Sequence, residues 1–227
     1  MLFFAGCDFN CPNCNTSNIL FTKDEFLVDL KDIKKEMKNS LGTTAVVFTG
    51  GEPCLQRQAL LTLASFAKDI NLKTGLETNG SKTECIRSLL SLGIIDFIAL
   101  DIKAPFEEEL FEKATKSKTF FKTTASIMTD LKNTLKLLKQ YQDKVEIEIR
   151  TTITPTLVAR KEEILKIAQA IEGLECTWIL QQFNPQNVTN KRFSSIKPPS
   201  AEFLENLRKT VHKKYPNIRF FVESRLF

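Results

Sequence analysis

The sequence predicts an α/β protein, a partial, open parallel β/α barrel of about six βα units. Short apolar runs of strand length alternate with segments of helical periodicity along the chain. The chain has 227 residues, fewer than the roughly 250 of a closed eight-fold barrel. Glycines and polar residues directly follow several strand-like runs, as they do where parallel strands end at a reactive edge.

The individual elements follow from apolar spacing and from residues that begin or end helices. The predicted strands are residues 3–6, 45–48, 72–77, 94–101, 145–151, 177–183 and 218–222. The first predicted helix is capped by Asp24 and has the apolar face Leu27, Leu30, Ile33 and Met37. Further predicted helices cover residues 55–70, 82–92 (ending at Gly93), 107–113 and 160–171. Two more are a helix with the apolar positions Ile127, Leu131, Leu135 and Leu138 and a last helix capped by Ser200.

One predicted strand carries charges on alternate positions. Glu146, Glu148 and Arg150 alternate with β-branched residues, so one face of this strand is polar. Strands of an ordinary parallel sheet are apolar on both faces. The strand is therefore either an edge strand facing water or part of a polar interior that holds a ligand.

Composition narrows the function classes. Lys plus Arg is 32 against 27 for Asp plus Glu, a net charge of +5 spread along the chain, which does not predict a nucleic-acid partner. No apolar run reaches the roughly 18 residues of a membrane span. The start of the chain shows no basic leader, which favours the cytoplasm. We expect a single domain over residues 1–227, with a core at about 3–187 and a C-terminal helix and strand at 188–227.

Three of the six cysteines, Cys7, Cys11 and Cys14, form a C-x3-C-x2-C loop after the first predicted strand. Three thiolates on a [4Fe–4S] cluster leave one iron without a protein ligand, free to chelate a small molecule. Structural zinc, the alternative, needs a fourth ligand. The available ones, Cys54, Cys85, Cys176 and His212, are distant in sequence. We expect Cys54, Cys85 and Cys176 to have no role in the site, with Cys85 and Cys176 buried as small hydrophobic residues. We expect the single histidine to be exposed, which removes most hydrolase schemes that rely on a histidine base.

A second motif, Gly50-Gly51-Glu52-Pro53, follows the predicted strand 45–48. Glycines let the backbone approach a ligand closely, and Glu52 supplies a negative charge for an ammonium group. The motif alone is weak, but its place after a buried strand and after the cysteine loop strengthens it. Further polar residues follow the next predicted strands.

These motifs resemble the radical S-adenosylmethionine (radical SAM) enzymes. Together with residues 46–53, 76–80, 96–105, 150–152 and 181–183, they look most like the glycyl-radical-enzyme activases, and among these like the activators of anaerobic ribonucleoside-triphosphate reductase. The resemblance implies a [4Fe–4S] cluster and S-adenosylmethionine as cofactors. Reductive cleavage of S-adenosylmethionine would then generate a radical that converts a glycine of the reductase to a glycyl radical. It also implies a low-potential electron donor such as flavodoxin or ferredoxin.

The same resemblance implies roles for individual residues. Cys7, Cys11 and Cys14 would hold the cluster. Gly50, Gly51 and Glu52 would hold the amino end of S-adenosylmethionine, Thr78 and Asn79 would lie along it, Asp101 and Lys103 would sit beside its carboxylate, and Arg150 would contact the carboxylate or ribose. Two simpler interpretations stay open: Asp101 and Lys103 as a strand-end ion pair, and Arg150 paired only with Glu146 or Glu148.

The chain departs from the family pattern at two positions. Asn13 stands where an aromatic residue usually covers the adenine, so Phe9 or a backbone contact would have to replace it. Glu77 stands where relatives often have aspartate. The main alternative function is a radical SAM enzyme acting on a small molecule, such as a 7-carboxy-7-deazaguanine synthase; against it, residues 101–105 look activase-like. A third class, a zinc or iron–sulfur protein that merely binds a partner, also stays open.

Overall fold

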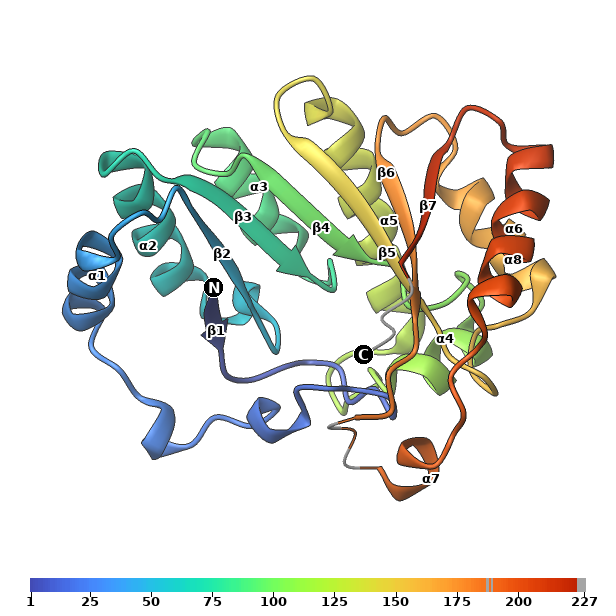
Figure 1. The fold of residues 1–227 in the computed structure, drawn as a ribbon. Coiled ribbons are helices and arrows are strands. Elements are labelled where there is room, and N and C mark those ends of the chain that lie inside the picture. The colour runs from blue at the N-terminus through green and yellow to red at the C-terminus, as the bar shows by residue number, and fades with distance from the viewer. Residues whose placement is uncertain (187, 189, 224–227) are drawn as a thin grey trace.

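The computed structural model describes residues 1–186, 188 and 190–223 of the chain. Its centre is one seven-stranded sheet in which all neighbouring strands run parallel, in the order β1-β2-β3-β4-β5-β6-β7 (Figure 1). The strands are β1 (Leu2–Phe4), β2 (Ala45–Gly50), β3 (Lys73–Thr78), β4 (Phe97–Asp101), β5 (Glu146–Ile153), β6 (Thr177–Gln182) and β7 (Arg219–Glu223). The predicted open β/α barrel is confirmed, with six crossovers joining the strands.

The helices lie in these crossovers, and most of them cover the outer side of the curved sheet, whereas the four-residue helix at the bottom of the view lies away from it (Figure 1). They are α1 (Leu30–Asn39), α2 (Arg57–Asp69), α3 (Thr83–Ser91), α4 (Glu108–Thr115), α5 (Thr124–Tyr141), α6 (Lys161–Ile171), α7 (Lys191–Ser194) and α8 (Ala201–Lys214). Short 3-10 turns lie at Ser17–Ile19, Asp24–Phe26 and Pro53–Gln56. In the described part of the chain, no helix is long and apolar enough to cross a membrane.

The core forms between the sheet and the apolar stripe of each helix. The predicted stripe of α2, with Leu60, Leu63, Ala64 and Ala67, is fully buried, as the helical period requires. Burial of such side chains is the main favourable term in folding, at roughly 25 cal/mol per Å² of apolar surface. Polar residues stand at the carboxyl ends of several strands, with Thr78 ending β3, Asp101 ending β4 and Gln182 ending β6.

The helix ends confirm two predicted signals and correct a third. Ser200 caps α8 by accepting a hydrogen bond from the Phe203 amide, and Gly93 follows α3 with φ +64°. The predicted cap at Asp24 is wrong. Asp24 begins only a 3-10 turn, and the backbone becomes extended at Leu27, whose side chain is 77% exposed.

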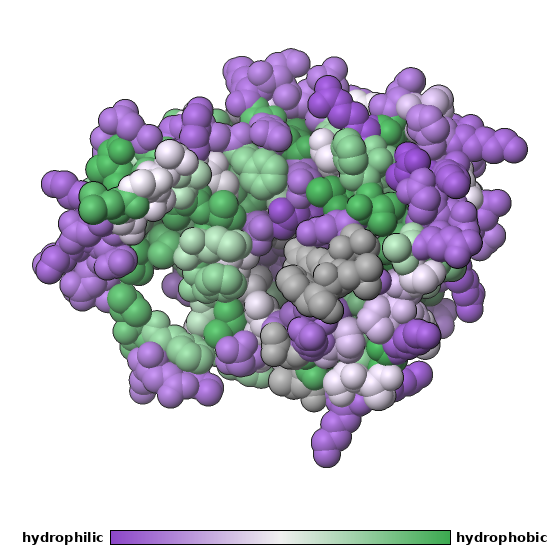
Figure 2. Space-filling model, in the orientation of Figure 1, coloured by the Kyte–Doolittle hydropathy of each residue, from purple (hydrophilic) through white to green (hydrophobic). Residues whose placement is uncertain are grey.

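The cap of α1 is Asp29 instead, because its backbone is extended and its carboxylate accepts from the Lys31 amide at 2.8 Å. The segment before α1 thus lies outside the core. Its apolar residues Phe21, Leu27 and Val28 are exposed. Hydrophobic side chains lie on the surface at the lower left of Figure 2, where Figure 1 places the segment between β1 and α1.

The charged strand predicted at residues 145–151 is β5, and it is not an edge strand. It lies between β4 and β6, so the interpretation of an edge facing water is wrong. Glu148, Arg150 and Thr152 are half-buried on one face, while Ile147, Ile149 and Ile153 are buried on the other. The polar face of β5 therefore belongs to the interior of the open barrel.

Candidate active site

A cavity of about 300 Å³ lies at the carboxyl ends of the strands. This is the edge where parallel α/β folds place their ligands. The cavity brings together ten of the eleven predicted site residues, which are Cys7, Cys11, Cys14, Gly50, Gly51, Thr78, Asn79, Asp101, Lys103 and Arg150. Glu52 is the one that does not line it.

The cysteine loop, residues 7–14, follows β1, is fastened to another segment at its start and closes a turn at its end. At its start the amides of Gly6 and Cys7 donate to the carbonyls of Ile19 and Leu20. At its end the Cys14 amide donates to the Cys11 carbonyl at 3.2 Å. All three thiols are free and half-buried. Such a turn places three sulfur ligands along one wall of the cavity.

Burial shapes the acid–base chemistry of these thiols. It raises the pKa of Cys7 to about 12 and that of Cys11 to about 11. The nearby Lys103 ammonium acts against burial at Cys11 and lowers its pKa. Thiols with such pKa values are protonated at neutral pH, so binding of a metal here would release protons.

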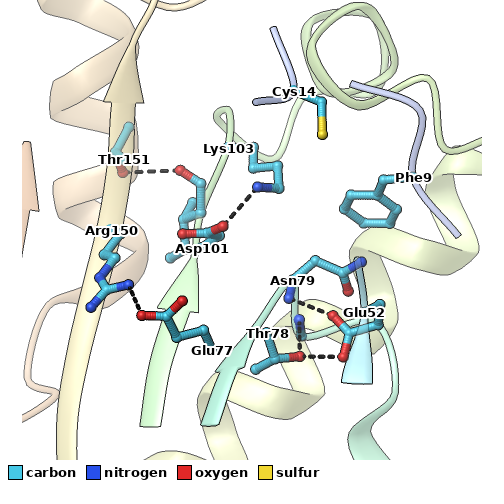
Figure 3. A network of polar contacts seen from close by, with 12 residues as sticks. Phe9, Cys14, Glu52, Glu77, Thr78, Asn79, Asp101, Lys103, Arg150 and Thr151 are labelled. Atoms are coloured by element: carbon cyan, nitrogen blue, oxygen red, sulfur yellow. Dashed lines mark hydrogen bonds and ion pairs between the residues drawn. The ribbon is translucent and has the colours of Figure 1, made fainter. Parts of the chain in front are cut away.

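Glu52 lies beneath the floor of the cavity and is fully buried. Its Oε1 accepts from the Cys54 amide at 3.0 Å and from Thr78 Oγ1 at 2.8 Å, and its Oε2 accepts from the Asn79 amide at 2.7 Å (Figure 3). Burial raises the pKa of Glu52 to about 7, although all three donors favour the carboxylate. Both oxygens are thus engaged by the protein, and Glu52 joins the turn after β2 to the end of β3.

The two glycines of this turn lie against the chain itself. A Cβ at Gly50 would stand 2.4 Å from the Phe4 carbonyl oxygen, and Gly50 has φ +120°. A Cβ at Gly51 would stand 2.2 Å from the Gly6 carbonyl oxygen. In place of side chains, the Gly51 amide donates to Phe4 and the Glu52 amide donates to Gly6, both at 2.8 Å. Close approach of backbone to backbone therefore requires both glycines.

Asp8, which the sequence analysis missed, ties the cysteine loop to the turn after β3. Its Oδ1 accepts from Asn79 Nδ2 at 2.8 Å, and its Oδ2 accepts from Ser81 Oγ at 2.6 Å and Lys82 Nζ at 2.9 Å. Asn79 Nδ2 also lies 4.0 Å from Cys7 Sγ. The only available signal was a carboxylate between two cysteines, since its partners are more than 70 residues away.

Asp101 and Lys103 form the predicted pair at the end of β4, with Lys103 Nζ 2.7 Å from Asp101 Oδ2. Burial opposes the charge of Lys103, but the neighbouring carboxylate of Asp101 outweighs it and raises the Lys103 pKa above its ordinary value. The pair faces the cysteine loop across the cavity (Figure 3). The ammonium is thus held charged beside the three sulfurs.

Arg150 connects two half-buried carboxylates. Its Nη1 lies 2.6 Å from Glu77 Oε1, and its Nε donates to Glu148. Thr49 Oγ1 donates to the other oxygen of Glu77 at 2.7 Å. The interpretation that Arg150 pairs only within its own strand is wrong, because Glu77 on β3 is a second partner (Figure 3). Thr49, Glu77 and Arg150 line the cavity, and Glu148 does not.

The two candidates for covering an adenine are placed differently from each other. Asn13 Nδ2 donates to Thr154 Oγ1 at 2.8 Å, so its amide fastens the cysteine loop to the turn after β5. Phe9 reaches the cavity wall but is only 2% exposed, and its ring packs edge-on against Phe111. Little of the Phe9 ring face is free to stack on a base.

The residues fit an iron–sulfur cluster better than a single metal ion. Among the described residues, no three His, Cys, Asp or Glu side chains converge on one ion position. Three cysteines that bind separate irons of a cluster need not converge. Cys54, Cys85 and Cys176 do not line the cavity, and His212 is exposed on α8. The fourth ligand that zinc would need is therefore missing from those candidates. Cys85 is buried as predicted, and Cys176 is half-buried.

Together, the open parallel sheet and the three-cysteine cavity at its carboxyl edge define a class of cofactor-dependent α/β enzymes. Residues 1–155 match the sequence profile of the Radical SAM superfamily, and the chain belongs to this superfamily. Members use a [4Fe–4S] cluster and S-adenosylmethionine.

Three relatives show how the chain compares with named proteins. A Methanocaldococcus jannaschii protein, provisionally named a glycyl-radical enzyme activating enzyme, is 28% identical over 96% of this chain and 86% of its own length. A pyruvate formate-lyase-activating enzyme of Clostridium pasteurianum is 27% identical over 77% of this chain and 69% of its own length. A 7-carboxy-7-deazaguanine synthase of Clostridium acetobutylicum is 29% identical over 61% of this chain and 64% of its own length.

Solved structures share the fold. A radical SAM methyltransferase from Sphaerobacter thermophilus superposes with a TM-score of 0.64 at 14% identity, over 96% of this chain and 63% of that one. A domain of a pyruvate-formate lyase-activating enzyme from Bacteroides vulgatus superposes with a TM-score of 0.58 at 12% identity, over 79% of this chain and 98% of that domain. At these identities the likeness concerns the fold alone.

Proposed function

We propose that this radical SAM enzyme generates a glycyl radical on a partner protein, anaerobic ribonucleoside-triphosphate reductase. The observation that carries the proposal is the extent of the match to activating enzymes. The relative from M. jannaschii covers 96% of the chain, and a pyruvate formate-lyase-activating enzyme of Streptococcus mutans covers 93%. The 7-carboxy-7-deazaguanine synthases cover between 34% and 70%. The reductase is proposed as the partner because residues 46–53, 76–80, 96–105, 150–152 and 181–183 resemble its activators.

In this proposal the cysteine loop would hold the cluster through Cys7, Cys11 and Cys14. When bound, the cluster and S-adenosylmethionine supply reductive cleavage of a sulfonium and removal of a hydrogen atom. Lys103 and Arg150 offer cationic side chains for the carboxylate end of the cofactor. Each is already paired with a carboxylate, which fixes its position before a ligand arrives.

The amino end would lie along Gly50, Gly51 and Asn79. Because Glu52 does not line the cavity, its part is to position Thr78 and Asn79 through their hydrogen bonds. Apolar side chains in the wall, Leu20, Leu157 and Val158, limit the access of water. A dry site protects a reactive radical from side reactions.

The test is electron paramagnetic resonance on anaerobically reconstituted enzyme with S-adenosylmethionine, a reductant and the reductase of the same host. We expect a glycyl radical signal on the reductase, and none with Cys11→Ala. A wild-type enzyme that cleaves S-adenosylmethionine without producing this signal contradicts the proposal.

The second candidate function is the chemistry of a 7-carboxy-7-deazaguanine synthase, which several relatives carry by name. The same enzyme preparation would then turn over a pterin substrate. Product analysis by mass spectrometry separates the two functions, because only the small-molecule reaction needs no protein partner.

A further inference from the structure

Two phenylalanines stand out on the surface between α4 and α5. Phe120 is 96% exposed and Phe121 is 91% exposed, and their rings contact each other edge-on at 5.2 Å between centroids. They lie in residues 116–123, which we name the aromatic loop. Large aromatic side chains exposed together on a soluble protein are typical of interaction sites.

The aromatic loop is ordered by hydrogen bonds rather than by burial. At its tip the Thr119 amide donates to the Lys122 carbonyl at 2.9 Å, and the amides of Phe121 and Lys122 donate to Thr119 Oγ1. At its base Glu112 accepts from the Lys118 amide and from Thr124 Oγ1. The exposed rings are therefore presented by a pre-formed turn, which reduces the entropy cost of binding.

The helix α4, which leads directly into the aromatic loop, lies against the cysteine loop. The Asn10 amide, between Cys7 and Cys11, donates to the Thr115 carbonyl at 2.9 Å. Phe9 packs against Phe111 of α4. The cavity is lined by Ala114 but by no residue of the aromatic loop. The aromatic loop therefore begins one residue after a backbone contact with the cysteine loop and lies outside the cavity.

The charge around the loop is positive. Lys113, Lys116 and Lys118 are exposed, and within the described residues no carboxylate forms an ion pair with them. Lys122 is the member that is paired, with Asp130 at 2.7 Å. The acidic residues Glu108 and Glu109 lie in the first turn of α4, at its other end. The rings are thus framed by three unpaired cations, which favour a negatively charged partner.

We propose that the aromatic loop and Lys113, Lys116 and Lys118 form the docking surface for an acidic one-electron carrier protein. The inference rests on the proposed function, in which the cluster of the cysteine loop must receive an electron from outside the chain. In that step one electron passes from the reduced carrier to the oxidised cluster, with no bond or proton transferred.

Position distinguishes this partner from the substrate protein. The substrate's glycine must enter the cavity, whereas an electron carrier only has to approach the cluster ligands from outside. The proposed surface lies outside the cavity and beside α4, the helix that contacts the cysteine loop, so it meets the second requirement and not the first. Binding by the substrate protein is therefore an outcome that the test must separate.

The test uses holoenzyme and stopped-flow bleaching of the cluster by a reduced, negatively charged flavodoxin. Phe120→Ser/Phe121→Ser and Lys113→Gln/Lys116→Asn/Lys118→Gln should each slow reduction about tenfold or more at low salt, as expected for loss of an electrostatically steered encounter. Calorimetric titration with oxidised flavodoxin should show a matching loss of affinity. A control with equal charge change, Lys132→Gln/Lys136→Gln/Lys139→Gln on α5, should leave both unchanged.

Dithionite, which needs no docking surface, should reduce the cluster of every variant at the wild-type rate. Unchanged reduction by flavodoxin in the loop variants overturns the proposal, and so does an equal slowing with dithionite. A glycyl radical yield that falls even under dithionite assigns the surface to the substrate protein instead. Failure of the wild type to cleave S-adenosylmethionine under dithionite contradicts the proposed function, and is distinguishable because flavodoxin binding is measured separately.

Discussion

Replacing Asp8 with alanine should destabilise the protein and loosen the cysteine loop. The carboxylate is 18% exposed and accepts from Asn79, Ser81 and Lys82 at 2.8, 2.6 and 2.9 Å. Lys82 can turn to water, but Asn79 and Ser81 are buried. Hydrogen bonds to a charged group contribute about 1.5–3 kcal/mol each. Two such losses, partly relieved by water, give about 3 kcal/mol.

Thermal unfolding of the apoprotein under reducing conditions measures this loss. For a chain of this length, about 3 kcal/mol corresponds to a decrease of roughly 6–12 °C in Tm. Asp8→Asn should show about half of it, because the amide keeps one acceptor oxygen. Asp143→Ala, which removes an exposed carboxylate, should stay within about 0.5 kcal/mol of the wild type.

The pH dependence gives a second readout with a defined sign. Although burial acts to raise it, the hydrogen bonds from Ser81, Lys82 and Asn79 hold the pKa of Asp8 below its ordinary value of 3.8. The stabilisation is therefore fully present above that value and is lost as the pH falls further. The gap between wild type and Asp8→Asn should narrow below pH 4. Equal stability of Asp8→Ala and Asp143→Ala at pH 7 would refute the reasoning.

Four further predictions concern single residues. Cys11→Ala should abolish cleavage of S-adenosylmethionine yet lower the free energy of urea unfolding by no more than about 1 kcal/mol, because it removes a single half-buried sulfur atom; retained cleavage contradicts the cluster assignment. Arg150→Ala should lower the free energy of unfolding by about 2 kcal/mol, because the carboxylate of Glu77 loses its ion pair. Arg150→Lys should recover only part of this free energy, since a single ammonium replaces the planar guanidinium. Burial raises the pKa of Glu52 from 4.5 to about 7, so between these pH values the native state holds a proton that the unfolded chain releases. The free energy of unfolding should therefore fall by at most about 3 kcal/mol between pH 4.5 and 7. Glu52→Gln should flatten this slope in chemical denaturation. Ser200→Ala should cost about 1 kcal/mol of thermal stability through the lost cap, and no loss would indicate that the Phe203 amide finds water instead.

The strand and helix pattern was predictable because each element repeats a local spacing. The α2 stripe and the Ser200 cap depend only on residues within one or two turns. The start of α1 was not predictable in this way. Asp24 and Asp29 are both suitable caps, and the choice depends on where the preceding segment leaves the cysteine loop. That is a tertiary constraint which local spacing does not contain.

The cavity was predictable where its residues follow strands directly. Asp101 and Lys103 lie two positions apart at the end of β4, so their pairing was an open alternative. The contacts of Asp8 with Ser81 and of Arg150 with Glu77 each span 73 residues. They depend on which strands are neighbours and in what register, and neither follows from residue type and spacing alone.

The crowding around Gly51 sets a limit on redesign of this scaffold. A methyl group there would stand 2.2 Å from the Gly6 carbonyl oxygen, far closer than van der Waals contact allows. To admit it, the first strand would have to shift sideways and carry Cys7 with it. Engineers who wish to enlarge the pocket for a new substrate should therefore vary the wall at Leu157 and Val158 and keep both glycines.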